Sequence, residues 1–174
     1  NLHGIPGFGA AADAMRRAWC EGTEGMRLRY LRDALFEELL ASLADVRVNG
    51  AIDPPCWTAG YAVRGLRLPH NLNVTLLGAD GKMFHALVRD RVSLSAGSAC
   101  KALGGQRSHV LDAIGAPTDG AVMRVGLGAN VSEREVAEAA KAIVEAARAA
   151  GARPKTVGRG LDVGATVAPS GEAE

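Results

Sequence analysis

VSLSAGSACKALGGQRSHVLDAIG, residues Val92–Gly115, places one cysteine between two predicted elements of regular structure. Val92 and Leu94 alternate with two serines, which predicts a short strand. Small residues separate this strand from Cys100, and glycines follow the cysteine. Ser108 then begins a short helix as its N-cap residue. The pattern predicts a thiol on a loop of small residues, whereas a buried structural cysteine would have large apolar neighbours.

The composition is that of an ordinary soluble globular protein, because 48% of the 174 residues are apolar and 22% are charged. This length predicts one domain with a substantial core. No apolar run approaches the ~18 residues that a membrane-spanning helix needs. The 20 basic and 19 acidic side chains give a net charge of +1. Neither nucleic acid nor a membrane surface is therefore expected as a partner.

The three cysteines, Cys20, Cys56 and Cys100, are odd in number and widely spaced. This predicts neither a disulfide framework nor a zinc site, and it favours one functional thiol in a reducing compartment. Cys20 and Cys56 are interpreted as packing residues, since free cysteine behaves as a small hydrophobe. The chain begins at Asn1 without a signal peptide, so we expect a fragment of a longer protein.

Periodicity predicts helices near residues 6–20, 26–44, 82–89 and 132–150, and strands at 46–48, 72–77, 92–95 and 121–127. This order indicates an α+β fold, in which a small, mainly antiparallel sheet is covered by helices. The last helix opens on a capping box formed by Ser132 and Glu135. In the helix at 82–89, four side chains are expected to face inward: Met83, Phe84, Leu87 and Val88.

The helix predicted over 26–44 carries a stripe of leucines at helical spacing, with charged residues outside it. The stripe consists of Leu28, Leu31, Leu35, Leu39 and Leu43. The residues expected outside it are Arg29, Arg32, Asp33 and Glu37. This arrangement predicts a helix packed on a sheet.

The strand predicted at 121–127 places three apolar side chains on one face and Arg124 on the other. Two interpretations of Arg124 stay open: a solvated surface arginine, or a clamp that binds a carboxylate through two parallel hydrogen bonds. The thiol must react as a thiolate, a form that nearby Lys101 and Arg107 could favour. Cys100 and Arg124 together suggest a small carboxylic acid whose reacting atom is attacked by sulfur.

Four segments resemble one known family. SAGSAC at 95–100, followed after seven residues by SHVLDAIG at 108–115, resembles the active-site loop of cysteine desulfurases, which are pyridoxal-phosphate enzymes of the class V aminotransferase family. MRVGLG at 123–128 resembles the strand whose arginine holds the substrate carboxylate. NLHGIPGFGAA at 1–11 and LPHNLNV at 68–74 are similar to two further segments of the family. The resemblance covers roughly residues 1–150.

The resemblance implies a function for both candidate residues. Cys100 would attack the sulfur of L-cysteine bound to pyridoxal phosphate and become a persulfide, while alanine leaves. The sulfur would then pass to an acceptor protein, as in iron–sulfur cluster assembly. Arg124 would bind the substrate carboxylate. The complete enzyme is expected to be a cytoplasmic homodimer, and its C-terminal small domain would have the fold predicted here.

The resemblance also implies which residues are missing. The family's cofactor lysine, with a histidine before it, and its ring-binding aspartate and histidine belong to an upstream domain. Lys82, Lys101, Lys141 and Lys155 match no cofactor motif. Lys82 also stands where the family usually has an acidic residue, and Gly128-Ala129-Asn130 replaces its Gly-Arg pattern. No cofactor-binding residue and no metal ligand is therefore expected in this segment, which alone is expected to be inactive.

Three regions are expected along the chain. Residues 1–25 would form a helix that leads from the upstream cofactor domain, residues 26–151 the α+β domain with the cysteine loop, and residues 152–174 a disordered tail without function. Two other functions stay open. The chain could be a stand-alone persulfide carrier or interaction domain, or part of an enzyme that resembles selenocysteine lyase.

Overall fold

The computed structural model describes residues 1–51, 67–95 and 108–155, except for the side chains of 19–21. The elements follow one another as α1 (Gly4–Glu21), α2 (Thr23–Ser42), β1 (Val46–Val48), β2 (Asn71–Leu76), α4 (Gly81–Val88), α5 (His109–Ala113), β3 (Ala121–Gly126) and α6 (Glu133–Ala149). The order of helices and strands agrees with the sequence prediction. The segment at 92–95 forms only an isolated bridge at Ser95 rather than a regular strand.

The described strands form one antiparallel sheet in the order β1-β2-β3. Val74 of β2 lies opposite Val48 of β1 and Met123 of β3. Because paired residues share a face of the sheet, these side chains point to the same side, where Val74 and Met123 are fully buried. The small antiparallel sheet predicted from the sequence is confirmed.

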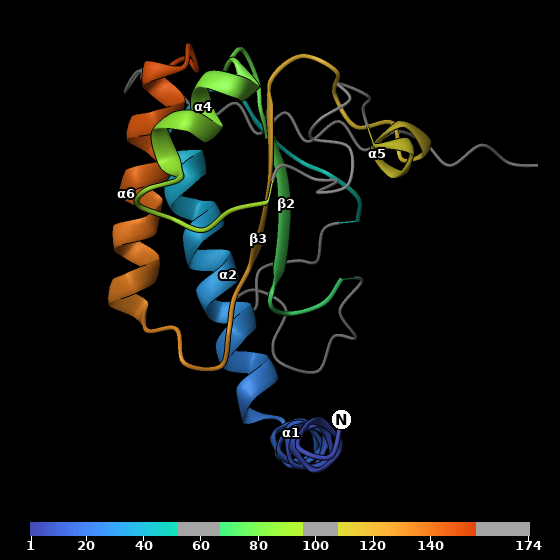
Figure 1. Ribbon diagram of the computed structural model, residues 1–174. Helices are drawn as coiled ribbons and strands as arrows, with labels where there is room; N and C mark the ends of the chain where they lie inside the picture. The colour runs from blue at the N-terminus through green and yellow to red at the C-terminus, as the bar shows by residue number, and fades with distance from the viewer. Residues whose placement is uncertain (52–66, 96–107, 156–174) are drawn as a thin grey trace, which may run out of the picture.

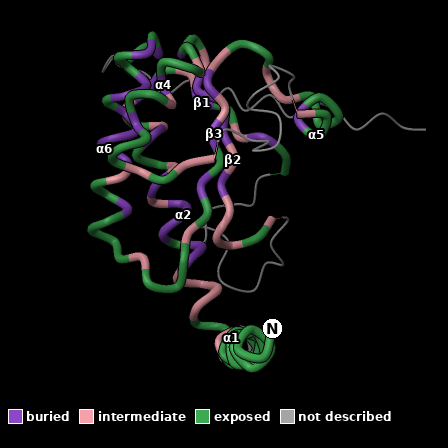
Figure 2. The backbone as a smooth tube through the Cα atoms, in the orientation of Figure 1, coloured by how far each residue is buried: buried purple, intermediate pink, exposed green. Residues whose placement is uncertain are grey.

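The helices α2, α4 and α6 lie on one side of the sheet, and α5 lies on the other (Figure 1). The apolar side chains of α2, α4 and α6 and the inner face of the sheet form one continuous core. Buried positions concentrate between α2, α6 and the strands (Figure 2). The leucine stripe of α2 is buried as predicted: Leu28, Leu31, Leu35, Leu39 and Leu43. Packing against the sheet therefore stabilises α2, as expected for an amphipathic helix.

The start of α6 has the predicted capping box. The Oγ of Ser132 accepts a hydrogen bond from Glu135 N, and the backbone N–H of Ser132 donates to Glu135 Oε2 at 2.8 Å. Hydrogen bonds from Ser132 to the carboxylate lower the pKa of Glu135 below its ordinary value. Gly151 follows the helix with φ 107°, a conformation that a side chain would strain.

Two details of α2 differ from the sequence prediction. The helix begins at Thr23 and not near Met26, because Gly22 alone, with φ 73°, makes the break after α1. Arg32 and Asp33 are also buried rather than exposed. Arg32 donates to Asp33 Oδ1 at 2.7 and 2.9 Å and to the carbonyl of Leu68 at 3.4 Å. Hydrophobic periodicity places charges outside, but a paired guanidinium and carboxylate can be buried together.

Arg29 was also expected outside the stripe, and it too is buried. Its Nε lies 3.9 Å from Asp33 Oδ2, one helical turn away. In α4 the sequence prediction overestimates burial. Of the four side chains expected to face inward, only Phe84 and Val88 are buried. Met83 is 48% exposed and Leu87 is 43% exposed. The short helix therefore contacts the core through a narrow i, i+4 stripe.

The packed domain extends beyond the expected boundary at residue 151. Ala152 is buried, and Pro154 forms a bridge with Leu43. The backbone N–H of Ala44 donates to Arg153 O at 2.9 Å, and that of Lys155 donates to Ser42 O at 3.1 Å. The first four residues of the expected tail are thus part of the domain, and residues 156–174 lie outside the described part of the chain.

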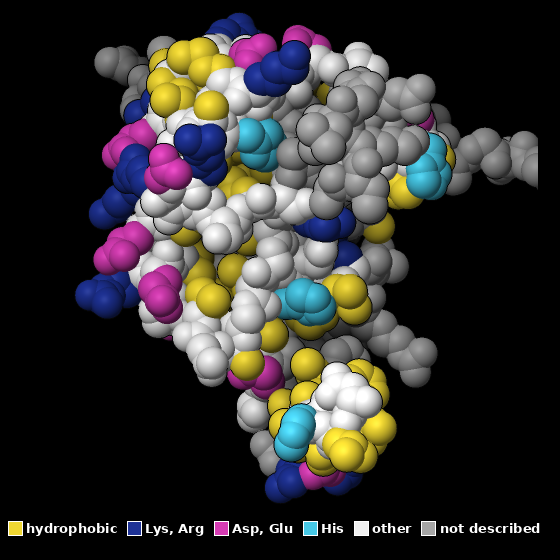
Figure 3. Space-filling model, in the orientation of Figure 1, with side chains coloured by type: hydrophobic (Ala, Val, Ile, Leu, Met, Phe, Trp, Pro, Cys, Tyr) yellow, Lys and Arg dark blue, Asp and Glu magenta, His cyan; other side chains and the backbone are white. Residues whose placement is uncertain are grey.

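Helix α1 lies apart from the sheet, at the N-terminal end of α2 (Figure 1). Among its described side chains only Asp13 and Ala18 are partly buried. Ile5, Phe8 and Met15 are 72%, 78% and 65% exposed. Figure 3 shows the apolar side chains gathered on this helix. The described part of α1 therefore presents an apolar surface that the domain itself does not cover.

Candidate functional site

Arg124 lies on the face of β3 that points away from the core. The strand alternates in burial, with Ala121, Met123 and Val125 buried and Arg124 exposed. The alternation predicted from the sequence is therefore confirmed. Because the guanidinium is exposed on this outer face, it can reach a ligand there.

Ser95 binds Arg124 through three hydrogen bonds. The backbone N–H of Arg124 donates to Ser95 O at 2.8 Å, and that of Ser95 donates to Arg124 O at 3.2 Å. Nη2 of Arg124 also donates to Ser95 Oγ at 3.2 Å. The last described residue before the cysteine loop is thus joined to the strand of the arginine. Sequence analysis missed this pairing, since no local pattern specifies which strand a short segment will join.

Cys100 and the loop of small residues predicted around it lie outside the described residues, as do Cys56, Lys101 and Arg107. The covalent chain still limits its position. Cys100 follows Ser95 by five positions, and a fully extended chain spans at most about 3.6 Å per position. The Cα atom of Cys100 therefore lies within roughly 18 Å of that of Ser95.

The outer face of the sheet carries further polar side chains near Arg124. Asn73 of β2 lies directly opposite Arg124. Its Oδ1 accepts a hydrogen bond from Asn49 Nδ2 at 2.8 Å, and Asn49 Oδ1 accepts one from Thr75 Oγ1 at 3.1 Å. The sequence analysis named Asn73 only as part of a family motif. The one local signal for it is that it is a polar residue within an apolar strand.

Lys82, Lys141 and Lys155 are all exposed, and Lys155 Nζ donates to the carbonyl of Leu40 at the end of α2. None of them lines the outer face of the sheet next to Arg124. In the described ranges there is also no group of three His, Cys, Asp or Glu side chains that could hold a metal ion. No described helix is long and apolar enough to cross a membrane.

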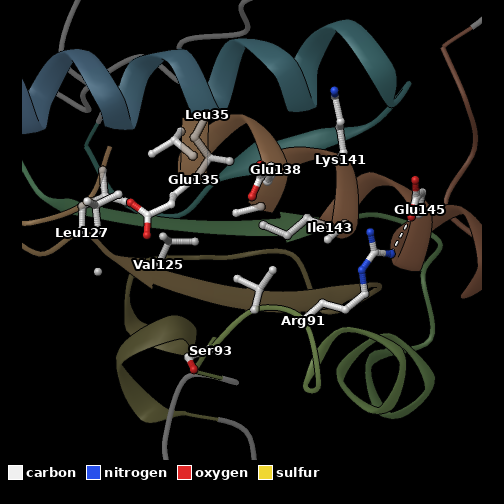
Figure 4. A pocket seen from close by; sticks show the side chains of 16 residues that line it. Leu35, Arg91, Ser93, Val125, Leu127, Glu135, Glu138, Lys141, Ile143 and Glu145 are labelled. Atoms are coloured by element: carbon white, nitrogen blue, oxygen red, sulfur yellow. Dashed lines mark hydrogen bonds and ion pairs between the residues drawn. The ribbon is translucent and has the colours of Figure 1, made fainter. Parts of the chain in front are cut away.

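A separate groove of about 780 Å³ lies between α6, the end of β3 and residues 91–93 (Figure 4). Apolar side chains such as Leu35, Val125 and Ile143 line it. At one end, Arg91 Nη1 donates to Glu145 Oε2 at 2.5 Å. Neither Arg124 nor Ser95 is among its lining residues. The groove therefore is not part of the candidate site.

Comparison with known proteins finds cysteine desulfurases among the relatives of this chain. The cysteine desulfurase IscS of Anaeromyxobacter sp. (strain Fw109-5) is 35% identical over 151 residues, which is 85% of this chain and 33% of that protein. The IscS-like cysteine desulfurase of Mycobacterium tuberculosis (strain ATCC 25618 / H37Rv) is 37% identical over 131 residues, 71% of this chain and 30% of that protein. No family model matches the chain.

A solved structure of a NifS-like protein has a similar fold, with a TM-score of 0.56 and 25% identity. The match covers 81% of this chain and 33% of the solved chain. This chain therefore spans about one third of the length of the curated relatives that it matches.

Proposed function

Because this chain is homologous to a segment of the cysteine desulfurases, we propose that it is the C-terminal part of such an enzyme. The complete enzyme would take sulfur from L-cysteine and release alanine. The thiolate of Cys100 attacks the substrate sulfur and forms a sulfur–sulfur bond, so that the sulfur remains on Cys100 as a persulfide. The carbon–sulfur bond breaks, and the β-carbon keeps its electron pair and takes up a proton to become the methyl group of alanine. An acceptor protein then receives it. A thiolate is needed because the neutral thiol is a weak nucleophile.

Arg124 binds the substrate carboxylate in this proposal. The observation that carries it is the pairing of Ser95 with Arg124, because it joins the segment that leads to Cys100 to the strand of the clamp. A carboxylate held by Arg124 therefore lies within the distance that the chain after Ser95 can span. The planar guanidinium offers a carboxylate two parallel hydrogen bonds.

Pyridoxal phosphate is the proposed cofactor, held by residues outside this chain. The proposal includes a homodimer in the cytoplasm that supplies sulfur for iron–sulfur cluster assembly. It also includes the expectation that the N-terminal helix, α1 in the structure, leads from the upstream cofactor domain. The exposed apolar side chains of α1 support this placement, because a neighbouring domain would bury them.

The test is desulfuration by the full-length protein that contains this chain. Purified protein is mixed with L-cysteine and pyridoxal phosphate, alanine is quantified, and the modified peptide is mapped by mass spectrometry. We expect stoichiometric persulfide on Cys100 and alanine release over many turnovers when a thiol acceptor is present. Absence of alanine in a cofactor-loaded protein contradicts the enzyme. Persulfide on Cys100 only after addition of a separate desulfurase indicates a carrier instead.

A further inference from the structure

Four polar side chains lie in one row across the outer face of the sheet. Asn49 lies at the end of β1, Asn73 on β2, Arg124 on β3 and Ser95 on the segment beside β3. The backbone N–H of Asn49 donates to Asn73 O at 2.9 Å, Asn73 is the register partner of Arg124, and Ser95 is bridged to Arg124. Residues paired across strands share a face, so the row presents its side chains together.

The hydrogen-bonding pattern brings Asn73 and Arg124 close. Both backbone polar groups of Arg124 are bonded to Ser95, and the carbonyl of Asn73 accepts from Asn49 on the opposite side. Asn73 and Arg124 are therefore a non-hydrogen-bonded pair of the antiparallel ladder. In such pairs the Cα atoms lie about 4.5 Å apart and the side chains are closer than in the alternate pairs.

A chain of side-chain hydrogen bonds fixes the direction of the Asn73 amide. The hydroxyl of Thr75, fully buried, donates to Asn49 Oδ1, and Asn49 Nδ2, on a residue that is 5% exposed, donates to Asn73 Oδ1. The oxygen of Asn73 thus points toward β1. Because the oxygen and nitrogen of a carboxamide diverge from Cγ, Nδ2 points away from Asn49, and Arg124 is the register partner of Asn73 on the strand opposite β1. Within the described ranges no acceptor is bonded to this Nδ2.

We infer that Asn73 is a second binding residue for the substrate carboxylate, next to Arg124. This inference rests on the proposed function, because it takes the ligand of Arg124 to be a carboxylate. Nδ2 donates to one carboxylate oxygen while the guanidinium donates to both. A neutral amide would present an N–H group to one of these donors, so the pair selects a carboxylate over a carboxamide. Thr75 and Asn49 act through Asn73 by holding its amide in this direction.

The first experiment observes the side-chain amides by NMR in the ¹⁵N-labelled 174-residue chain. Asn73 is assigned by loss of its signal in Asn73→Asp, and Asn71 serves as the control amide. Asn71 lies on the same strand and the same face but opposite Gly126. Sodium acetate is the probe, with acetamide as its neutral analogue and sodium chloride at equal ionic strength. We expect acetate alone to shift the Asn73 amide and the Arg124 Nε signal in parallel, with no shift at Asn71.

The second experiment measures desulfuration kinetics of the full-length protein. We expect Asn73→Ala to raise KM for L-cysteine about tenfold, the effect of removing one hydrogen bond to a charged group, with kcat within about twofold. Asn71→Ala should leave KM unchanged. Because Asn73→Ala also removes the partner of buried Asn49, the double variant with Arg124→Lys is included. A shared carboxylate predicts a combined effect smaller than the product of the two single effects, whereas purely structural damage predicts that product.

The outcomes separate the inference from the proposed function. Acetate shifts at both Arg124 and Asn73 in a protein without desulfuration retain the carboxylate pair and overturn the enzyme assignment. Shifts at Arg124 without Asn73, or equal shifts with acetamide, overturn the role of Asn73 and leave the function standing. If neither residue responds to acetate and Asn73→Ala leaves KM unchanged, the proposal that Asn73 and Arg124 bind one carboxylate is overturned. The proposal is also overturned if Asn73→Ala raises KM but the double variant shows the product of the two single effects.

Discussion

Ser95 and Arg124 are joined by two backbone hydrogen bonds and by a contact of 3.2 Å between Arg124 Nη2 and Ser95 Oγ. The side-chain contact holds one end of the guanidinium against the segment that leads to Cys100. A long arginine side chain loses considerable rotamer freedom when it binds a ligand. Under the proposed function, Ser95 therefore orients the Arg124 guanidinium before the substrate binds, so that less rotamer freedom is lost when the carboxylate is bound.

Replacement of Ser95 by Ala should test this orientation. The backbone bridge is unaffected, so the change removes only the Oγ contact with Arg124. We expect KM for L-cysteine to rise about three- to tenfold in the full-length protein, since a single contact of this kind contributes roughly 1 kcal/mol. Ser93→Ala is the matched control, because Ser93 lines the separate groove. An equal rise in KM for both variants contradicts a specific role for Ser95.

Replacement of Arg124 by Lys should chiefly weaken substrate binding. The ammonium keeps the charge but cannot make the planar two-point contact. We expect KM for L-cysteine to rise by about ten- to hundredfold in steady-state assays of the full-length protein, corresponding to roughly 1.5–3 kcal/mol. Replacement of Arg47, which is exposed on the neighbouring part of the sheet, provides the control. Unchanged kinetics for Arg124→Lys would return Arg124 to the solvated-surface interpretation.

Cys100 should be the fastest of the three thiols to react with a limiting amount of iodoacetamide. A nucleophilic cysteine must be accessible and must form a thiolate, whereas packed cysteines react slowly. Peptide mapping after competitive labelling compares Cys100 with Cys20 and Cys56. In the full-length enzyme we expect Cys100→Ser to abolish sulfur transfer and to leave cofactor absorbance intact, since a hydroxyl cannot carry a persulfide. Faster labelling of Cys20 or Cys56 would contradict the assignment of the nucleophile.

The capping box of α6 predicts a pH dependence of stability. The pKa of Glu135 is lower in the folded chain because Ser132 binds its carboxylate, so the folded state favours the ionised form. Its contribution is present above the pKa of the unfolded state and is lost as pH falls through the lowered folded-state pKa. Glu135→Gln should therefore reduce the free energy of unfolding at pH 7 but make little difference at pH 2.5. Urea unfolding at both values, with Glu138→Gln as the control for helix charge, measures this change.

Gly120 should not tolerate a side chain. Its φ is 128°, and a Cβ atom at this position would lie 2.4 Å from the carbonyl oxygen of Leu76. We expect Gly120→Ala to lower the free energy of unfolding by about 2 kcal/mol or more, because both the backbone and the contact with β2 are strained. Gly128→Ala, with no heavy atom within 4 Å of its Cβ position, is the control in the same urea titration. Equal stability of the two variants would contradict the turn geometry.

Local patterns predicted those features of the fold that local interactions determine. The alternation around Met123 placed Arg124 on the outer face, and the capping box placed the start of α6. The pairing of Ser95 with Arg124 and of Asn49 with Asn73 joins residues far apart in sequence. A short polar segment carries no periodic signal for such partners.

The buried charges of α2 show a second limit of sequence patterns. Arg32 can be buried because Asp33 and the carbonyl of Leu68 bind it. The latter lies 36 positions away in sequence. Hydrophobic periodicity describes each helix in isolation, so it cannot identify a charge that a remote backbone group will bind. In the same way, it overestimated the number of apolar side chains that short α4 buries.

The pairing of residues 153–155 with the end of α2 determines when this domain can finish folding during synthesis. Arg153 bonds to Asp45 across 108 positions of the chain, and Lys155 bonds to Leu40 across 115. The ribosome must therefore release the chain through residue 155 before residues 153–155 can pair with the segment beside Ala44. Until α6 has also been released, a nascent chain exposes the leucines of α2, which α6 covers in the finished domain. Such late, long-range closure slows folding and leaves apolar surface accessible to chaperones while translation continues.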